Sequence, residues 1–446
     1  MKTVRTIGQM MAITVCLVLL SVSQAMAFKP LAGNMSDFDP NNQKFPTSGD
    51  TIKIGIFEAF SGAMAGSGNI AMAQLGWVVH DINSQGGIFV DGKWKKLQLI
   101  KGDTQGKTAS AKRAGEKLVL EDKVDFMIGT TGTHIAAVGM QVAKKYKKLY
   151  VNHTALSESL MDVKSFNPYT FRVAGTTVMM AKAMAYFFSA RPERKFYIIC
   201  QDYSYGHAYA EAFKKAIKLY RPEAEVVGEL FHPIFAKDFA PYITKVKGAG
   251  AEVIVSGDWL LDGDNLMKQV KQMGLDVKIA GPFIGNPDTL RSMGKDPQIG
   301  TNVILQYDFP LSWYNPVHKK FIQTWRGQSK TWKKPYDTSF YKWPSAVRIY
   351  AATYWLLDLM QRTKTTDSKK LMKAWEGDSF SILGYTMQMD PCNHETAMDY
   401  GIAQYGFPNN WQDDVAAPEE PFIAPARFLL PYKDPKLCDK NNRRLK

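Results

Sequence analysis

The feature that most constrains this chain is a regular alternation of short apolar segments with helix-length amphipathic segments. Residues 51–57 and 96–101 have the apolar composition of strands, and residues 69–83 between them have the spacing of a helix. The same unit repeats up to residue 151, and a second series of units runs from about residue 179 to residue 280. Such alternation predicts mainly parallel sheets with helices on both faces, because each parallel connection must cross over the sheet. The sequence therefore predicts two similar α/β lobes.

The start of the chain has the features of a secretory signal peptide. Two basic residues come first, residues 10–22 form an apolar centre, and residues 25–27 supply the small residues of a cleavage site. Cys16 lacks the small-residue context of a lipid-anchored cysteine, so we expect a soluble protein exported to the periplasm. Residues 28–50 contain three prolines and no periodicity, which predicts an extended N-terminal arm.

The charge balance and the cysteines narrow the partners and the compartment. The chain has 56 Lys and Arg against 42 Asp and Glu, and its lysines are spread through helical segments such as residues 144–148. Such runs are usually solvated helix faces, so we expect no nucleic-acid partner. Cys200 ends an apolar strand and is expected to be buried. In an oxidising compartment, Cys392 and Cys438 are predicted to form a disulfide that holds the proline-rich end of the chain.

Motifs for cofactors, metals and catalysis are weak or missing in the sequence. Residues 66–71 fit GxGxxA, but the loop before them is long, so we interpret them as a glycine-rich turn whose N–H groups could hold a carboxylate. The seven histidines show no paired metal spacing. Asp258, Asp262 and Asp264 lack the EF-hand order and are expected to be solvated loop acids. Because no nucleophile elbow occurs either, we predict no cofactor, no metal and no enzymatic activity.

A set of short motifs in a fixed order carries a family resemblance. Residues 79–88, Val-His-Asp-Ile-Asn-Ser-Gln-Gly-Gly-Ile, form a helix-to-turn signature, and residues 60–62, Phe-Ser-Gly, precede it at the proper distance. Further matches follow in order at residues 102–103, 126–129, 202–206, 237–239 and 273–275. Through these motifs the chain resembles, from about residue 51 to about residue 403, the leucine/isoleucine/valine-binding-protein-like periplasmic substrate-binding proteins of branched-chain amino acid and amide ABC importers.

The resemblance implies a type I periplasmic binding fold. In this fold two Rossmann-like α/β lobes are joined by three crossover hinge segments, which would fall near residues 173, 306 and 380. The lobes would close on a ligand held at the carboxyl ends of the strands. The predicted division is a signal peptide at 1–27, an N-terminal arm at 28–50, an N-terminal lobe at 51–172 and 306–380, a C-terminal lobe at 173–305 and 381–403, and a C-terminal tail at 404–446.

The resemblance also implies a ligand pocket, residue by residue. The first-lobe hydroxyl that grips the ligand carboxylate corresponds to Thr133, and a neighbouring backbone donor falls near Thr154. The next hydroxyl position falls at Leu156, where the adjacent Ser157 can substitute. The full predicted ligand-binding set is Ser61, Ser67, Thr133, Thr154, Leu156, Ser157, Tyr205, Trp259 and Phe283.

The chain departs from the family pattern at two pocket positions. The aromatic residue that covers the ligand corresponds to Ser67, and the acid that pairs with the ligand ammonium corresponds to Phe283. A buried ammonium without a carboxylate partner would be costly. Two alternatives therefore stay open: the ligand has no ammonium group, or another acid takes the role. The acids available for that role are Glu58, Asp202, Asp258 and Asp262.

The function implied by the resemblance is capture of a small amino acid, carboxylate or amide and its delivery to the permease subunits of an ABC importer. An alternative is a sensory module of the same fold that signals to a membrane receptor or kinase. Both hypotheses use the same cleft and differ in the partner surface. An exported enzyme ranks below them because the sequence offers no catalytic constellation.

Overall fold

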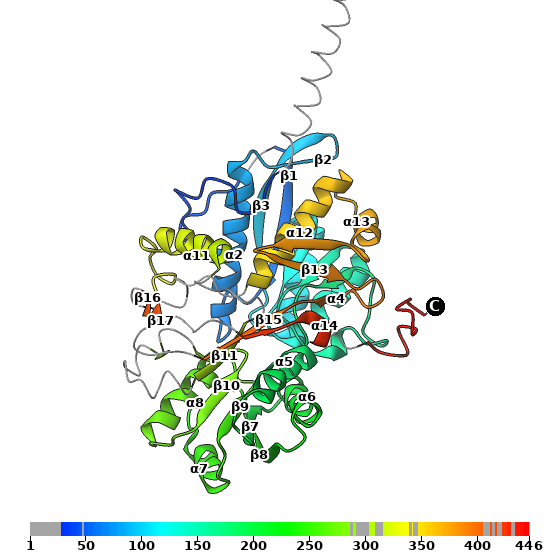
Figure 1. The fold of residues 1–446 in the computed structure, drawn as a ribbon. Coiled ribbons are helices and arrows are strands. Elements are labelled where there is room, and N and C mark those ends of the chain that lie inside the picture. Colours follow the sequence, from blue (N-terminus) through cyan, green and yellow to red (C-terminus); the bar gives the residue numbers. More distant parts are fainter. Residues whose placement is uncertain are drawn as a thin grey trace, which may run out of the picture.

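The computed structural model describes residues 28–46, 49–285, 289–290, 303–307, 315–338, 341, 347–404, 411–412, 415–416, 422–429 and 433–445. The predicted signal peptide lies outside the described residues. Two α/β lobes, each with its own main sheet, form the body of the structure (Figure 1). The predicted fold class of two α/β lobes is confirmed. Among the helices within the described ranges, none is long and apolar enough to cross a membrane.

The first lobe is built on a six-stranded sheet that is parallel apart from an edge hairpin. Apolar residues of the helices cover both faces, so the central strands are almost fully buried. Three helices, α2 (Ala65–Ser84), α3 (Thr108–Leu120) and α4 (Thr133–Tyr146), connect the strands. In spatial order the strands are β2 (Ile88–Val90), β3 (Lys93–Asp103), β1 (Thr51–Glu58), β4 (Phe126–Gly129), β5 (Leu149–Asn152) and β6 (Thr170–Arg172).

Helix α2 begins earlier than the sequence suggests. The interpretation of residues 66–71 as a glycine-rich turn is wrong, because all of them lie within α2. Gly68 donates its backbone N–H to the Ala59 carbonyl oxygen at 3.0 Å, and a Cβ on Gly68 would lie only 2.2 Å from that oxygen. Glycine is needed here because α2 packs closely against the loop after β1.

The second lobe is built on a seven-stranded sheet. The strands β7 to β11 run parallel, and β15 and β18 extend one edge in antiparallel pairing. The helices of this lobe are α5 (Thr177–Ser189), α6 (Ser204–Tyr220), α7 (Ala240–Gly248) and α8 (Leu261–Gln272). In spatial order the strands are β18 (Phe422–Ala424), β15 (Tyr400–Gln404), β11 (Val303–Tyr307), β10 (Lys278–Gly281), β9 (Val253–Ser256), β7 (Lys195–Gln201) and β8 (Glu225–His232).

The chain passes between the lobes three times. It leaves the first lobe after β6 and enters the second. After β11 it returns to the first lobe with the helices α11 (Pro316–Ser329), α12 (Val347–Thr363) and α13 (Ser368–Trp375). Helix α12 packs against α2. It then runs through the small sheet of β12 (Ser379–Ile382), β13 (Tyr385–Met389) and β14 (Thr396–Ala397) to β15. The residue limits of the lobes given above stay a prediction.

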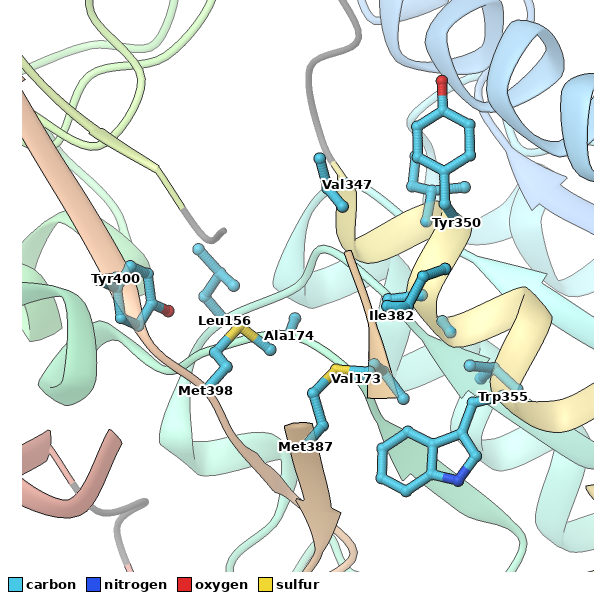
Figure 2. Packing of buried hydrophobic residues seen from close by; sticks show 14 of the residues in the cluster. Leu156, Val173, Ala174, Val347, Tyr350, Trp355, Ile382, Met387, Met398 and Tyr400 are labelled. Atoms are coloured by element: carbon cyan, nitrogen blue, oxygen red, sulfur yellow. The ribbon is translucent and has the colours of Figure 1, made fainter. Parts of the chain in front are cut away.

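The crossover segments are held to one another by buried contacts. Arg172 at the end of β6 forms a buried ion pair with Glu395, and its backbone N–H donates to the His394 carbonyl oxygen at 2.8 Å. Figure 2 shows Ala174, just after β6, beside Met398, just before β15, and both belong to the main apolar core. The first and third crossovers therefore form one packed unit.

Both ends of the described chain are held by contacts with distant segments. In the N-terminal arm, Phe38 is buried against Trp77 of α2 and Trp325 of α11, with ring centroids 5.2 and 6.5 Å away. At the other end Cys392 and Cys438 form a disulfide, with their Cα atoms 5.9 Å apart. Cys200 is a free, buried cysteine, as expected.

Candidate ligand-binding site

The candidate site is formed by residues that follow strands of both sheets. First-lobe residues come after β1, β4 and β5, and second-lobe residues come after β7, β9 and β10. The carboxyl ends of parallel strands are the usual place for ligands in α/β folds. Arg348 in α12 joins the two groups, because its guanidinium carbon lies 6.0 Å from the centre of the Phe283 ring, which follows β10.

Glu58, at the end of β1, holds the first-lobe loops together. Its carboxylate is 1% exposed and accepts hydrogen bonds from the Ser67 hydroxyl at 3.0 Å and the Thr130 hydroxyl at 3.1 Å. The backbone N–H of Thr131 donates to its two oxygens at 3.0 and 2.9 Å. Burial raises the pKa of Glu58, while these donors favour the ionised form. Its hydrogen-bonding capacity is thus used largely within the chain.

The predicted hydroxyl donors of the first lobe differ in their availability. Thr133 is the first residue of α4, and its hydroxyl has no hydrogen-bond partner among the described residues. The Thr154 N–H is already used, because it donates to the Asn152 side-chain oxygen at 3.1 Å. Ser61 is exposed and donates to the Asp103 carboxylate at 2.6 Å. Thr133 is therefore the predicted donor that a ligand could reach without displacing a partner within the described chain.

Leu156 and Ser157 face the protein interior. Leu156 is 4% exposed and belongs to the main apolar core, next to Ala174 and Met398 in Figure 2. The Ser157 hydroxyl lies 2.9 Å from the Ser159 hydroxyl. Their role in ligand binding stays a prediction.

The three aromatic residues predicted for the second lobe are linked through Tyr203 and Tyr205. The Trp259 indole N–H donates to the Tyr203 hydroxyl at 2.9 Å, and the rings of Tyr203 and Tyr205 lie 5.7 Å apart. Phe283 lies 6.3 Å from Tyr205. The Tyr205 hydroxyl is buried and has no hydrogen-bond partner within the part of the chain that the structure describes. These rings form an apolar wall with one unused hydroxyl.

The acids named as possible ammonium partners in the second lobe all have partners within the chain. Asp202 is exposed and lies 2.7 Å from the His207 imidazole. Asp258 forms a buried ion pair with His232 at 3.0 Å. Asp262 accepts hydrogen bonds from the Gln201 amide at 2.5 Å and the Phe235 N–H at 2.9 Å.

The expectation that Asp258 and Asp262 are solvated loop acids is wrong. Both side chains are fully buried, and Asp262 lies in the first turn of α8. Loop acids become buried here because imidazole, amide and backbone donors are supplied by β7, β8 and the loop after β8, which sequence spacing does not reveal. No cluster of three or more metal-binding side chains occurs among the residues that were placed.

Two residues of the site, His153 and Arg348, were not found by reading the sequence. His153 follows β5 and is 1% exposed; its Nδ1 lies 2.5 Å from the Thr154 hydroxyl, and its Nε2 has no partner among described residues. Burial and the nearby Arg348 charge lower the pKa of His153 to about 3. Arg348 is 9% exposed, and burial lowers its pKa to about 10, so the guanidinium stays charged at neutral pH. The sequence feature that could have identified Arg348 is a charged residue near the start of an otherwise mostly apolar helical segment, residues 347–357.

The structure has two α/β lobes joined by three crossovers, and polar and aromatic residues of the two lobes lie near one another. These features define the class of two-lobe ligand-binding proteins. The chain belongs to the family described as "Periplasmic binding protein", whose model matches residues 51–410. This confirms the family resemblance. Among curated relatives, the chain is 29% identical over 231 residues to "Leu/Ile/Val-binding protein homolog 3" of Brucella melitensis, and the match covers 52% of this chain and 60% of that protein.

Solved structures share the fold at low sequence identity. The leucine-, isoleucine-, valine-, threonine- and alanine-binding protein of Brucella ovis, in a closed conformation, has a TM-score of 0.73 and 19% identity, covering 86% of this chain and 97% of that one. An ABC transporter solute-binding protein of Rhodopseudomonas palustris, solved with 3,4-dihydroxybenzoic acid, has a TM-score of 0.70 and 21% identity, covering 84% and 98%. At these identities the likeness shows the two-lobe fold.

Proposed function

We propose that this protein is an extracytoplasmic solute-binding protein that captures a small amino acid, carboxylate or amide between its lobes and delivers it to the permease of an ABC importer. The observation that carries the proposal is the approach of Arg348, on a helix packed against the first lobe, to Phe283 in the second lobe. A side chain that lies close to a residue of the other lobe can couple ligand binding to lobe closure.

The relatives support this function by what their names describe. One structural neighbour binds branched-chain and small amino acids, and another holds a dihydroxybenzoic acid. The signal peptide predicted at 1–27 is consistent with a periplasmic location, and cleavage after residue 27 can be checked by mass spectrometry of the exported protein.

The test is a binding and transport assay on the exported protein. After partial unfolding to remove any bound compound and refolding, thermal shift is measured with amino acids, small carboxylates and amides. A ligand at 100 times its Kd adds about 2.7 kcal/mol to the free energy of unfolding. Scattering then compares the dimensions of the free and bound protein, and vesicles with the associated importer report uptake of the labelled ligand.

The outcomes separate the candidate functions. Binding, compaction and uptake are expected. Binding and compaction without uptake would favour the sensory alternative, and absence of binding across the whole panel would contradict the proposal.

A further inference from the structure

The last described segment of the chain, residues 433–445, contacts both the first lobe and the third crossover, and we call it the C-terminal strap. The disulfide between Cys392 and Cys438 joins the strap to the loop between β13 and β14, in the third crossover. At the start of the strap, the Asp434 carboxylate accepts the backbone N–H of Val163, in the first lobe, at 2.9 Å. The strap therefore connects two parts of the structure that are far apart in sequence.

Arg444, near the other end of the strap, touches three further groups. Its Nε donates to the Cys392 carbonyl oxygen at 2.8 Å, and its Nη2 lies 2.9 Å from the carboxylate of Glu376, just after α13. The same nitrogen lies 2.6 Å from Nε2 of His394, and the guanidinium carbon lies 4.5 Å from the centre of the Phe166 ring. Hydrogen bonds from a guanidinium to a carboxylate are among the strong ones in proteins. One side chain thus holds the loop before β6, the end of α13 and the third crossover together.

His394 passes this contact on to the first crossover. Its side chain is fully buried, and its ring stacks on Phe171 of β6 with the centroids 4.0 Å apart. Burial lowers the pKa of His394, so the imidazole is neutral. Its Nδ1 then donates to the Thr170 carbonyl oxygen at 3.0 Å, and its Nε2 accepts from Arg444. Since the His394 carbonyl oxygen also accepts the N–H of Arg172, the strap is linked to the end of β6.

These contacts all lie on the first-lobe side of the crossovers. Beyond them, residues 173–176 lead from β6 to α5, and residues 398–399 lead from β14 to β15. Both α5 and β15 belong to the second lobe. In a hinged closure, a few residues at the ends of elements take up the change in backbone angles while the packed parts move as rigid bodies. The two short stretches are the parts of these crossovers that the strap leaves able to bend.

We propose that the C-terminal strap is a conformational device of the hinge. It holds the first-lobe ends of the first and third crossovers in one arrangement, and so confines the bending of these two crossovers to residues 173–176 and 398–399. The disulfide and Arg444 are its two points of attachment to the third crossover. The inference rests on the two-lobe fold and goes beyond ligand capture, so it can be tested without a ligand and can fail separately from the proposed function.

The first test is amide hydrogen exchange, followed by mass spectrometry on the full exported chain without added ligand. Arg444→Gln removes the ion pair with Glu376 and keeps the disulfide. The N–H of Arg172 and the N–H of Asp390 donate to the carbonyl oxygens of residues 394 and 395, both at 2.8 Å. Peptides that contain these two amides are expected to exchange about 10-fold or more faster in the variant, because a loosened strap lets the crossovers open locally.

Arg443→Gln is the matched control. Arg443 is the neighbouring residue, its side chain is 73% exposed, and its ion pair with Asp439 at 3.3 Å stays within the strap. Its substitution removes the same charge and is expected to leave the exchange of both crossovers as in the natural chain. If Arg444→Gln does not fold, Arg444→Lys keeps the charge but loses the forked geometry, and Arg443→Lys is then its control.

The second test measures the distance between the lobes. Spin labels are placed through Glu121→Cys, exposed just after α3, and Lys247→Cys, exposed on α7, while the natural free cysteine, Cys200, is buried. Pulsed electron spin resonance then gives the distribution of label-to-label distances without ligand. Arg444→Gln is expected to broaden this distribution because more residues of the crossovers can bend, and Arg443→Gln is expected to leave it unchanged.

Each combination of results has one meaning. Faster exchange together with a broader distance distribution in Arg444→Gln, with neither change in Arg443→Gln, is the expected result. Faster exchange with an unchanged distribution would overturn the hinge role and leave the strap as a stabilising segment only. Unchanged exchange in folded Arg444→Gln, or equal effects of the two substitutions, would overturn the inference that Arg444 holds the crossovers. All of these results leave the proposed function as it stands.

Discussion

Acidification should destabilise the protein through His153. Its ordinary pKa of 6.5 falls to about 3 in the folded state because burial and the Arg348 charge oppose protonation. Between these two values the unfolded chain binds the proton more tightly, so the stability is complete above pH 6.5 and decreases as the pH falls. At pH 5 the folded imidazole is neutral and the unfolded one is mostly charged. Relative to pH 7, this single group therefore costs about 2 kcal/mol of unfolding free energy.

The assay is urea unfolding, followed by tryptophan fluorescence at pH 7 and pH 5. His153→Asn can keep a hydrogen bond to Thr154 and does not titrate, so the loss between the two pH values should be about 2 kcal/mol smaller in this variant than in the natural chain. His134→Asn is the control for replacing a histidine by asparagine, because His134 is exposed at the start of α4. The reasoning is refuted if His153→Asn and the natural chain lose the same free energy.

Three further changes test the crossovers and the site. Replacing Cys392 and Cys438 by Ala opens a loop with a sequence separation of 46 residues, and urea unfolding should show a loss of about 4 kcal/mol. Arg172→Met leaves Glu395 buried without its ionic partner and should cost about 3–5 kcal/mol, most of which Arg172→Met combined with Glu395→Leu should recover in the same assay. Tyr205→Phe removes a buried hydroxyl that has no partner within the described chain, so calorimetry should show weaker ligand binding while the unfolding free energy does not fall.

The alternating pattern of the sequence was enough to predict the parallel parts of both sheets. The strand expected at 51–57 is β1 (Thr51–Glu58), and the strand expected at 96–101 lies within β3 (Lys93–Asp103). These elements are detectable because each buries a face with its own periodicity. By contrast, β18 joins the second sheet through antiparallel pairing with β15. A three-residue strand whose partner lies some twenty residues earlier has no local signature of that kind.

Aromatic residues after residue 302 also follow a pattern that the sequence could resolve in part. Aromatic residues at helical spacing are more often core than a sugar-binding face, and Trp325, Trp332 and Tyr336 are buried as that interpretation requires. Their neighbour Phe38 comes from the N-terminal arm, which was expected to be extended without a known docking place. The arm carries five large apolar side chains, Phe28, Leu31, Met35, Phe38 and Phe45, without a regular spacing, so its docking depends on a surface that only the folded lobe provides.

The site was harder to predict because residue identity does not say which atoms are already used. Glu58 was named as a possible ammonium partner from its type and position, yet its carboxylate binds donors from α2 and the loop after β4. Thr154 corresponds to a backbone donor, yet the Asn152 side chain accepts its N–H. Such local side-chain hydrogen bonds compete with a ligand for the same groups. Assigning the family's pocket residues to this sequence position by position therefore locates a candidate site better than it identifies the ligand.

Arg348 shows why the surroundings of a side chain depend on long-range contacts. In sequence it is one basic residue on a helix that is apolar on most sides, a position where a long side chain usually extends to water. In the structure, the packing of α12 against α2 and the approach of Phe283 bury it, and residues from β15 and α6 become its neighbours. The position that corresponds to the family's ammonium-binding acid is Phe283, and a cation lies over that ring. Neither the burial of Arg348 nor its approach to Phe283 can be predicted from the order of residues along α12, because both depend on segments far away in the sequence.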